Sequence, residues 1–342
     1  MLATPITELF GIKHPVLLAG MGGVSDAELA AAVTNAGGLG SIGGAMMSRQ
    51  VMKRNIEMLK EELADKKAPF GVDLLIPQVG GNARKTNKDY TGGHLAELID
   101  IMIAGGTKLF TCAVGVPPKW AVDKLHSAGI PVMNMVGAVK HVEKALAAGA
   151  DLICAQGGEA GGHTGDVATS VLIPKVVDAC RGRKSPLTGG PVLVVAAGGI
   201  FDGRGLAMAL SMGAAGVWVG TRFVACTEAG AGPYHKNLIK KTGYSDTVRT
   251  TIYTGRPMRV NATEFVRDWE EKRSEEIKRK LASGVVPTPY GSQEKYQDRP
   301  YLMGQAAGAI EDVKPAKEIV EEMVEQAHEL ISGASRMLIS KL

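Results

Sequence analysis

One histidine lies in a glycine-rich segment that directly follows a short apolar run. The run ends at Gln156, and Gly-Gly-Glu-Ala-Gly-Gly then leads to His163. An imidazole titrates near neutral pH, so a positioned histidine can accept a proton from an acidic carbon or stabilise an anion. A solitary histidine is more often structural, but the glycines and the strand-end position favour a catalytic role for His163. Glu159 and Asp166 flank it, and we expect them to fix the loop by accepting backbone N–H bonds.

Gln156 ends the apolar run and offers both a donor and an acceptor, which suits the polar edge of a pyrimidine-like ring. Two later apolar runs, residues 192–199 and 216–221, end in Ala-Gly-Gly and Gly-Thr. Loops after consecutive strands, together with a helix N-terminus, form a recurrent phosphate site. A phosphate group is therefore predicted at the five residues that end these runs, Ala197, Gly198, Gly199, Gly220 and Thr221. Taken singly, each motif is also compatible with a tight turn that binds nothing.

A third glycine-rich strand end lies near the N-terminus. The run that begins at Pro15 leads into Gly20-Met21-Gly22-Gly23. A segment with so few side-chain atoms can lie flat against a planar ring, so Gly20, Met21 and Gly22 are predicted to contact one. The alternative is a plain turn into a helix that a capping box at Ser25 begins.

Short β-type runs alternate with helical patterns over the first two thirds of the chain, as expected for parallel βα units. Eight consecutive units favour an α/β fold of the (β/α)8 TIM-barrel type, with a doubly wound sheet as the alternative. In a barrel, the glycine-rich strand ends would meet at one face. The predicted strands begin near His14, Gly38, Phe70, Lys108, Pro131, Asp151, Val192 and Gly216.

The pattern changes after Cys226. We predict a barrel over residues 1–226, a mainly helical lid or appendage over 227–305, and a final segment over 306–342. The final segment carries apolar residues at helical spacing, so its helix should return to pack on the barrel.

The segment between Leu75 and His94 is too long for an ordinary βα connection, and it is predicted to be an active-site lid. Its basic residues, Arg84, Lys85 and Lys88, are interpreted as a solvated face. Attraction of an anionic substrate or cofactor is the alternative.

Composition argues against several function classes. The 342 residues carry a net charge of +4 without a basic stripe, so no nucleic-acid partner is expected. The longest apolar run, residues 191–201, is about half of the roughly 20 residues a membrane helix needs, so no membrane partner is expected either. The 4 cysteines and 7 histidines show no metal-type spacing, and no metal is predicted. We expect an intracellular, soluble protein that is cytoplasmic or peroxisomal, because Ser340-Lys341-Leu342 spells the peroxisomal signal.

The ordered set of motifs, at residues 20–22, 156–163, 197–204 and 220–223, resembles the nitronate monooxygenase family, formerly called 2-nitropropane dioxygenases. The resemblance spans roughly residues 5–235, and Gly-Gln-Ala-Ala-Gly at 304–308 fits it as well. It implies a TIM barrel with non-covalent FMN and a smaller helical domain over the cleft.

The resemblance also implies a role for each motif. The residues Gly20, Met21 and Gly22 would face the isoalloxazine, and Gln156 its polar edge. Gly161 would contact the ring and ribityl region, with Gly162 also at the cofactor. The phosphate would lie at Ala197, Gly198, Gly199, Gly220 and Thr221. His163 falls on the family's catalytic histidine.

The implied reaction is oxidation of alkyl nitronates or nitroalkanes by FMN and dioxygen, giving a carbonyl compound and nitrite. Similar barrels carry out NAD(P)H-dependent reduction of enoyl thioesters or quinones, and this alternative stays open. A non-catalytic barrel that binds a phosphate ligand is a third reading. The expected partners are a small-molecule substrate and dioxygen, and a homo-oligomer is left open.

The chain departs from the family pattern in two places. Asp73 stands where similar proteins often have asparagine, and the segment 75–94 is longer than expected. An ionised carboxylate near the ring would disfavour an anionic nitronate.

Overall fold

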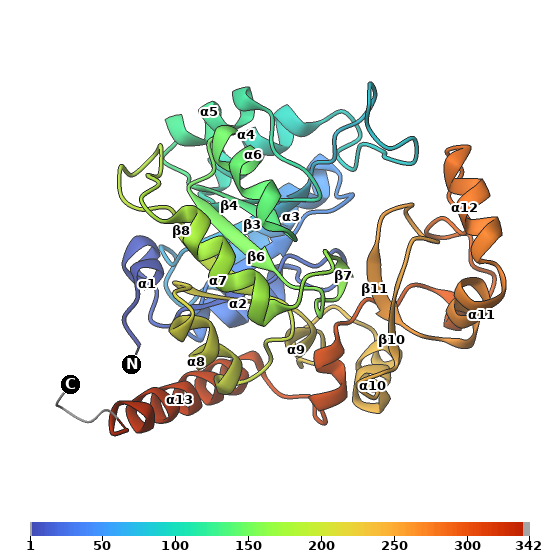
Figure 1. Ribbon diagram of the computed structural model, residues 1–342. Coiled ribbons are helices and arrows are strands. Elements are labelled where there is room, and N and C mark those ends of the chain that lie inside the picture. Colours follow the sequence, from blue (N-terminus) through green and yellow to red (C-terminus); the bar gives the residue numbers. More distant parts are fainter. Residues whose placement is uncertain (1, 338–342) are drawn as a thin grey trace.

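A computed structural model describes residues 2–337 of the chain. One sheet of eight parallel strands, in the order β1-β9-β8-β6-β5-β4-β3-β2, forms its centre (Figure 1). A parallel bridge between Leu17 and Leu39 joins the two edges of the sheet, so it curls into a barrel. The TIM-barrel prediction is confirmed, and all eight predicted strands are present. They are β1 (Val16–Leu18), β2 (Gly40–Gly43), β3 (Phe70–Leu75), β4 (Leu109–Ala113), β5 (Val132–Val136), β6 (Leu152–Gln156), β8 (Leu193–Ala197) and β9 (Gly216–Val219).

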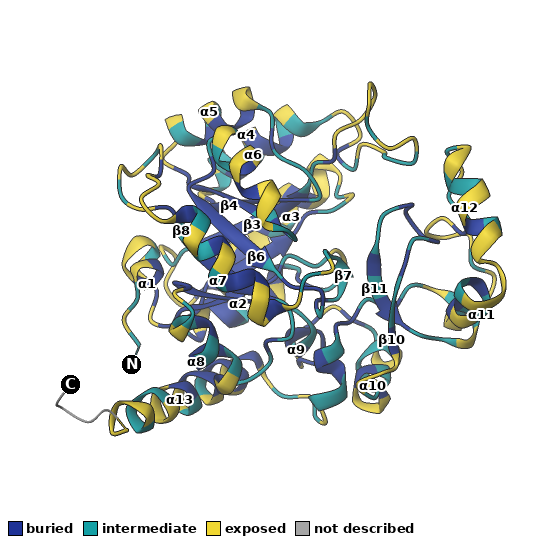
Figure 2. Cartoon of the chain, in the orientation of Figure 1, coloured by how far each residue is buried: buried dark blue, intermediate teal, exposed yellow. Residues whose placement is uncertain are grey.

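Helices surround the barrel and bury their apolar faces against the outside of the strands, which are almost wholly buried (Figure 2). Short helix α1 (Pro5–Phe10) precedes the first strand. A separate apolar cluster, which includes Leu109, Met133, Leu152 and Trp218, fills the inside of the barrel. The surrounding helices are α2 (Ala27–Asn35), α3 (Arg49–Glu62), α4 (Leu95–Gly105), α5 (Lys119–Ser127), α6 (Val142–Ala147) with the 3-10 turn η1 (Val139–His141), α7 (Thr169–Cys180), α8 (Gly203–Ser211) and α9 (Thr221–Val224).

The predicted capping box at Ser25 is wrong. Helix α2 begins after Asp26, whose own side chain makes no capping hydrogen bond, and Asn55 Oδ1 of α3 accepts the N–H of Ala27 at 3.2 Å. The Ser25 hydroxyl instead accepts a hydrogen bond from the backbone N–H of Met21 at 2.7 Å. Ser25 therefore shapes the glycine-rich loop before α2.

The appendage contains a small sheet that the sequence did not predict, in addition to its helices. Strand β10 (Thr247–Thr250) pairs antiparallel with β11 (Met258–Asn261), and β11 pairs with the short strand β7 (Gly162–His163). Its own apolar core includes Tyr253, Val260 and Trp269. The helices are α10 (Pro233–Lys241), α11 (Glu264–Lys272) and α12 (Ser274–Ala282), of which α11 and α12 lie farthest from the barrel (Figure 1).

The chain then returns to the barrel, as predicted. After the 3-10 turns η2 (Tyr296–Asp298) and η3 (Gln305–Ala309), helix α13 (Ala316–Ser335) packs against α8 and α2. The predicted divisions at residues 226 and 305 stay predictions, and the Ser-Lys-Leu end lies outside the described residues. Between residues 2 and 337, no helix combines the length and apolar character that a membrane span requires.

The long segment between β3 and α4 reaches across to the appendage. Lys85 Nζ donates to the carbonyl oxygen of Ala282 at 3.1 Å, and Arg256 Nε donates to Asn87 Oδ1 at 2.9 Å. These contacts fit the predicted lid, because they hold the segment beside the open end of the barrel.

Candidate active site

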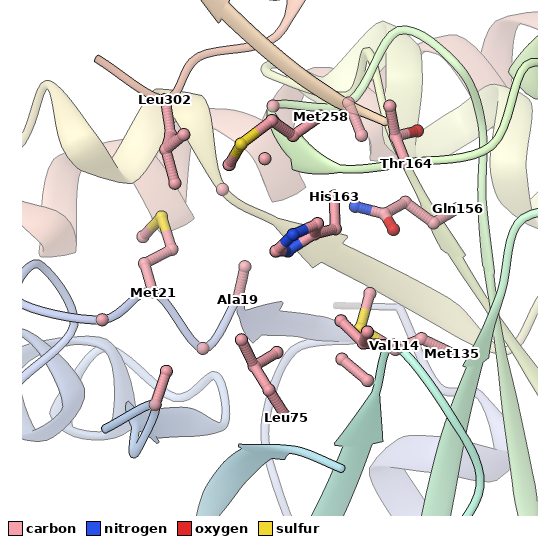
Figure 3. Close-up of a pocket in the computed structure, with 18 of the residues that line it drawn as sticks. Ala19, Met21, Leu75, Val114, Met135, Gln156, His163, Thr164, Met258 and Leu302 are labelled. Atoms are coloured by element: carbon pink, nitrogen blue, oxygen red, sulfur yellow. The ribbon is translucent and has the colours of Figure 1, made fainter. Parts of the chain in front are cut away.

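All the predicted site residues line one cavity of about 1340 Å³ at the carboxyl ends of the barrel strands. Its walls are largely apolar, with Met21, Val114 and Met258 around a central space that the His163 ring and the Gln156 side chain enter (Figure 3). The predicted residues brought together are Gly20, Met21, Gly22, Gln156, Gly161, Gly162, His163, Ala197, Gly198, Gly199, Gly220 and Thr221. Their roles toward a ligand stay predictions.

His163 belongs to both parts of the molecule. It follows barrel strand β6 in the chain, but as part of β7 it pairs with Met258 of the appendage. Its Nε2 lies 3.1 Å from the Thr254 hydroxyl. Burial, and then the positive charge of Arg256, lower the pKa of His163 to about 4. The imidazole is therefore neutral at pH 7, which is the form that accepts a proton.

Glu159 fixes the loop that carries the histidine. Its carboxylate accepts the backbone N–H of Thr169 at 3.0 Å and the Thr169 hydroxyl at 2.6 Å. The expectation for Glu159 is confirmed. Asp166 differs from its expectation, because its carboxylate pairs with the side chain of Arg249 and not with a backbone N–H.

The ends of β8 and β9 form the predicted phosphate region. Gly198 and Gly199 have φ values of 95° and 73°, a backbone conformation that favours glycine. A Cβ on Gly220 would meet only ordinary contacts, the nearest at 3.6 Å, so the protein itself does not require glycine there. Within the described residues, the backbone N–H groups of Gly199 and Gly220 have no acceptor. These features fit a phosphate group that approaches the backbone closely.

The helix that follows β8 does not contribute as predicted. Asp202 Oδ1 accepts the N–H groups of Arg204 and Gly205 at 3.0 and 3.2 Å, and Gln326 of α13 accepts that of Gly203 at 2.8 Å. The first turn of α8 is thus already satisfied. A phosphate at this place would therefore meet the strand-end loops and not the first turn of α8.

The Gly20–Gly22 loop follows β1 and lies beside Gly220, because β1 pairs with β9. A Cβ on Gly20 would stand 2.2 Å from the Cβ of Asp73, so only glycine fits beside that side chain. Glycine is required at position 161, because a Cβ there would lie 2.6 Å from the backbone of Met303. Gly161 thus lies against the segment that returns from the appendage, and it also lines the cavity.

Val114, at the end of β4, has a φ of 72°, which is unfavourable for a β-branched residue. Its side chain is thereby held in the cavity wall (Figure 3). We expect Val114→Gly to raise the free energy of unfolding by about 1 kcal/mol, because it releases this strain. Urea unfolding checks the value. Val114→Ala is the matched control, because it removes the side-chain bulk but keeps the strain, and equal stabilities of the two variants would contradict the argument.

Two arginines place uncompensated positive charge at the cavity. Arg84 Nη1 donates to the Gly255 carbonyl oxygen at 3.4 Å, and Arg256 donates to Asn87. Neither has a carboxylate within ion-pair distance among the described residues. Burial, and then Arg84, lower the pKa of Arg256 from its ordinary value. Arg84 is exposed, as the solvated interpretation expects, and it also lines the cavity, so attraction of an anion stays the alternative.

The sequence missed the contribution of the appendage to this cavity. Thr254, Arg256 and Met258 lie in a region predicted to be mainly helical. The Thr-Gly-Arg-Pro turn at 254–257, between apolar residues on both sides, is the signal that could have marked it.

Comparison with known proteins agrees with this arrangement. A family model described as nitronate monooxygenase matches residues 3–326. A probable nitronate monooxygenase of Staphylococcus saprophyticus is 30% identical, with 97% of this chain and 99% of that one covered. A (3aS,4S,5R,7aS)-5-hydroxy-7a-methyl-1-oxo-octahydro-1H-indene-4-carboxyl-CoA dehydrogenase of Mycobacterium tuberculosis is 40% identical, with 79% of this chain and 69% of that one covered.

Two solved structures share the fold over nearly the whole chain. FabK from Thermotoga maritima has a TM-score of 0.78 at 30% identity, with 99% of this chain and 100% of that one covered. A nitroalkane oxidase from Streptomyces ansochromogenes has a TM-score of 0.78 at 26% identity, with coverages of 96% and 99%. The chain therefore belongs to the nitronate monooxygenase family and is an oxidoreductase enzyme.

Proposed function

We propose that the cavity binds FMN and that the enzyme oxidises alkyl nitronates, and the neutral nitroalkanes that give rise to them. The observation that carries this proposal is that the His163 imidazole and the Arg256 guanidinium line the same cavity. Burial, and then the charge of Arg256, lower the pKa of His163, which favours its neutral form. A base and a cation at one place suit a substrate that becomes an anion when it loses a proton.

The residues present fit FMN. The strand-end N–H groups of Gly199 and Gly220 would hold its phosphate, and the Gly20–Gly22 loop would lie along its ring. Gln156 would meet the polar edge of the ring. When bound, FMN supplies electron transfer from substrate to dioxygen, and the protein supplies position and electrostatics.

His163 performs the proton step for a neutral nitroalkane. Its ring nitrogen takes the proton from the carbon that bears the nitro group, and the bond's electron pair stays on the substrate as nitronate. Arg256 stabilises the negative charge that forms. Two nitronates and one dioxygen then give two carbonyl compounds and two nitrites, which balances atoms, charge and electrons.

The names of several relatives support the oxidation of nitronates or nitroalkanes. The family model, the staphylococcal relative and the Streptomyces nitroalkane oxidase all refer to this chemistry. A second candidate is NAD(P)H-dependent reduction of an enoyl thioester. In that reaction one hydride and one proton add across the carbon–carbon double bond, and NAD(P)⁺ is released.

Two observations favour the second candidate. The cavity of about 1340 Å³ has room for a substrate larger than a small nitronate, and the arginines at its side suit a phosphorylated carrier. The mycobacterial relative is named for a coenzyme A ester, although it is named as a dehydrogenase.

An anaerobic reduction experiment separates the candidates. The purified protein, loaded with FMN, is mixed with propionate 3-nitronate, NADH or NADPH, and flavin absorbance is followed. Reduction by the nitronate, and oxygen uptake without NAD(P)H, support the first candidate. Rapid bleaching by NAD(P)H but not by nitronate supports the second. A colourless protein that fails to take up FMN overturns both and leaves the phosphate-binding barrel.

The variant Arg256→Gln tests whether the positive charge of Arg256 binds an anionic substrate. We expect KM for an anionic nitronate to rise about tenfold, which corresponds to a loss of roughly 1.4 kcal/mol of binding. Arg256→Lys, which keeps the charge, should recover part of that loss. Steady-state kinetics with a nitronate and with its neutral nitroalkane measure the effect. Equal increases in KM for both forms would show that Arg256 shapes the cavity and does not bind charge.

A further inference from the structure

Asp73 is a buried carboxyl group without a protein partner, at the wall of the cavity. It lies near the end of β3, and only 5% of the residue is exposed. Neither carboxyl oxygen takes part in a hydrogen bond with any described residue, and Oδ1 is completely shielded. The side chain borders the cavity, and its Oδ2 lies against Gly20, where an added Cβ would be 2.5 Å away. The loop predicted to lie along the flavin ring therefore rests on Asp73.

The surroundings of Asp73 hold no charge that would compensate a carboxylate. The titratable groups that interact with Asp73 are the thiols of Cys112 on β4 and Cys154 on β6. Burial raises the pKa of both thiols, so they stay neutral. The neighbouring hydroxyls of Ser41 and Thr111 also lack partners. Burial raises the pKa of Asp73 itself to about 8, with no other cause. At pH 7 the group is therefore a neutral carboxylic acid.

A neutral carboxylic acid has one O–H to donate, and a buried donor that stays unpaired is costly. Within the described residues, neither carboxyl oxygen of Asp73 has a hydrogen-bond partner. Because the side chain borders the cavity beside Gly20, an acceptor placed in the cavity can pair with it. The ring nitrogens and carbonyl oxygens of a flavin are acceptors of that kind.

We propose that Asp73, as a neutral acid, donates a hydrogen bond to the flavin ring and makes the redox behaviour of the cofactor sensitive to pH. This rests on the proposed binding of FMN. An asparagine at this position would also donate, through its amide, but it could not lose the proton. Aspartate can thus lose a proton that the amide does not have, and through this proton Asp73 makes the redox potential of the cofactor depend on pH.

The direction of the effect follows from the sign of the charge. Loss of the Asp73 proton at alkaline pH removes the donor and places a negative charge beside the ring. That charge disfavours the electron-rich reduced flavin, so the midpoint potential falls. It also weakens FMN binding, by about tenfold for each pH unit above the point where Asp73 ionises.

The same titration affects the stability of the protein without cofactor. The folded-state pKa of Asp73 is raised, so its contribution is fully present below the ordinary pKa of about 4. It is lost as pH rises toward about 8. Asp73→Asn removes this dependence. The variant is nearly isosteric, so it should fold and bind FMN.

The test compares the wild type, Asp73→Asn and Asp73→Leu, all loaded with FMN, between pH 6 and 9.5. The midpoint potential, FMN affinity and infrared difference spectrum on reduction are measured. We expect the wild type to show an alkaline decrease in potential and affinity, and a carboxylic acid C=O band that shifts on reduction. Asp73→Asn should lack the alkaline decrease and that band. Asp73→Leu, which has no donor, should bind FMN more weakly at every pH.

The outcomes separate this inference from the proposed function. FMN bound equally by all three proteins, with identical pH dependence, overturns the role of Asp73 and leaves FMN binding intact. Failure of the wild type to bind FMN overturns the cofactor proposal itself. A wild type that binds FMN but lacks the carboxylic acid band shows an ionised Asp73, which also overturns the inference.

Discussion

His163→Asn should lower kcat/KM for a neutral nitroalkane by about 10²- to 10⁴-fold, the usual contribution of a general base. The reason is that asparagine cannot accept the proton from the substrate carbon. FMN should stay bound, because the proposed phosphate site lies at the strand-end glycines and not at His163. Stopped-flow reduction of the flavin measures the effect directly. Turnover of the preformed nitronate, which has already lost the proton, should fall much less.

His141→Asn is the matched control, because His141 borders the same cavity but its side chain is exposed. This variant should keep the turnover of both substrates. If His163→Asn slows the nitroalkane and the nitronate equally, His163 orients substrate and is not the base.

The pH profile gives a further check on the same group. Because the pKa of His163 is lowered to about 4, the base form persists well below neutrality. The rate of nitroalkane turnover should therefore stay constant as the pH is lowered to about 5, and it should decrease only near pH 4. An acidic limb at the ordinary imidazole value of about 6.5 would contradict this. Below about pH 6.5, His163 is protonated in the unfolded chain but still neutral in the folded protein. The contribution of His163 to stability is therefore lost as the pH falls toward 4.

Asp151→Ala should cause the largest loss of stability, about 3–5 kcal/mol, since it breaks a buried charged network and leaves its donors unpaired. Asp151 directly precedes β6 and is 2% exposed. Its carboxylate accepts four hydrogen bonds that join α5, β5 and the loop before β8. The donors are His126 Nε2 at 2.8 Å, the Val132 N–H at 2.8 Å, the Ser185 hydroxyl at 2.6 Å and the Leu187 N–H at 3.1 Å.

Urea unfolding measures the loss. Asp123→Ala is the control, because Asp123 pairs with Lys119 on an exposed helix surface and should cost less than about 1 kcal/mol. A loss of less than about 1 kcal/mol for Asp151→Ala would show that solvent or nearby groups replace the carboxylate.

The barrel could be predicted because its signals are local. Each strand is a short apolar run, and the topology places every strand end at one face, so glycine motifs far apart in the chain meet without further information. This is why Gln156, Gly199 and Gly220, on three strands, were correctly expected around one cavity.

The missing features depend on contacts between distant segments. Thr254 meets His163 across 91 residues, and Gln326 caps α8 across 123 residues. The strands β10 and β11 are only four residues long each, too short to show a clear alternation. The raised pKa of Asp73 was also beyond the sequence, because it follows from the burial of the carboxyl group in the folded chain.

The pairing of β7 with β11 ties His163 to the appendage as well as to barrel strand β6. The imidazole is therefore positioned from two sides, by the loop that leaves the barrel and by a strand that belongs to the appendage. A substitution that shifts β11 would move His163 even though it lies far from the barrel in the sequence.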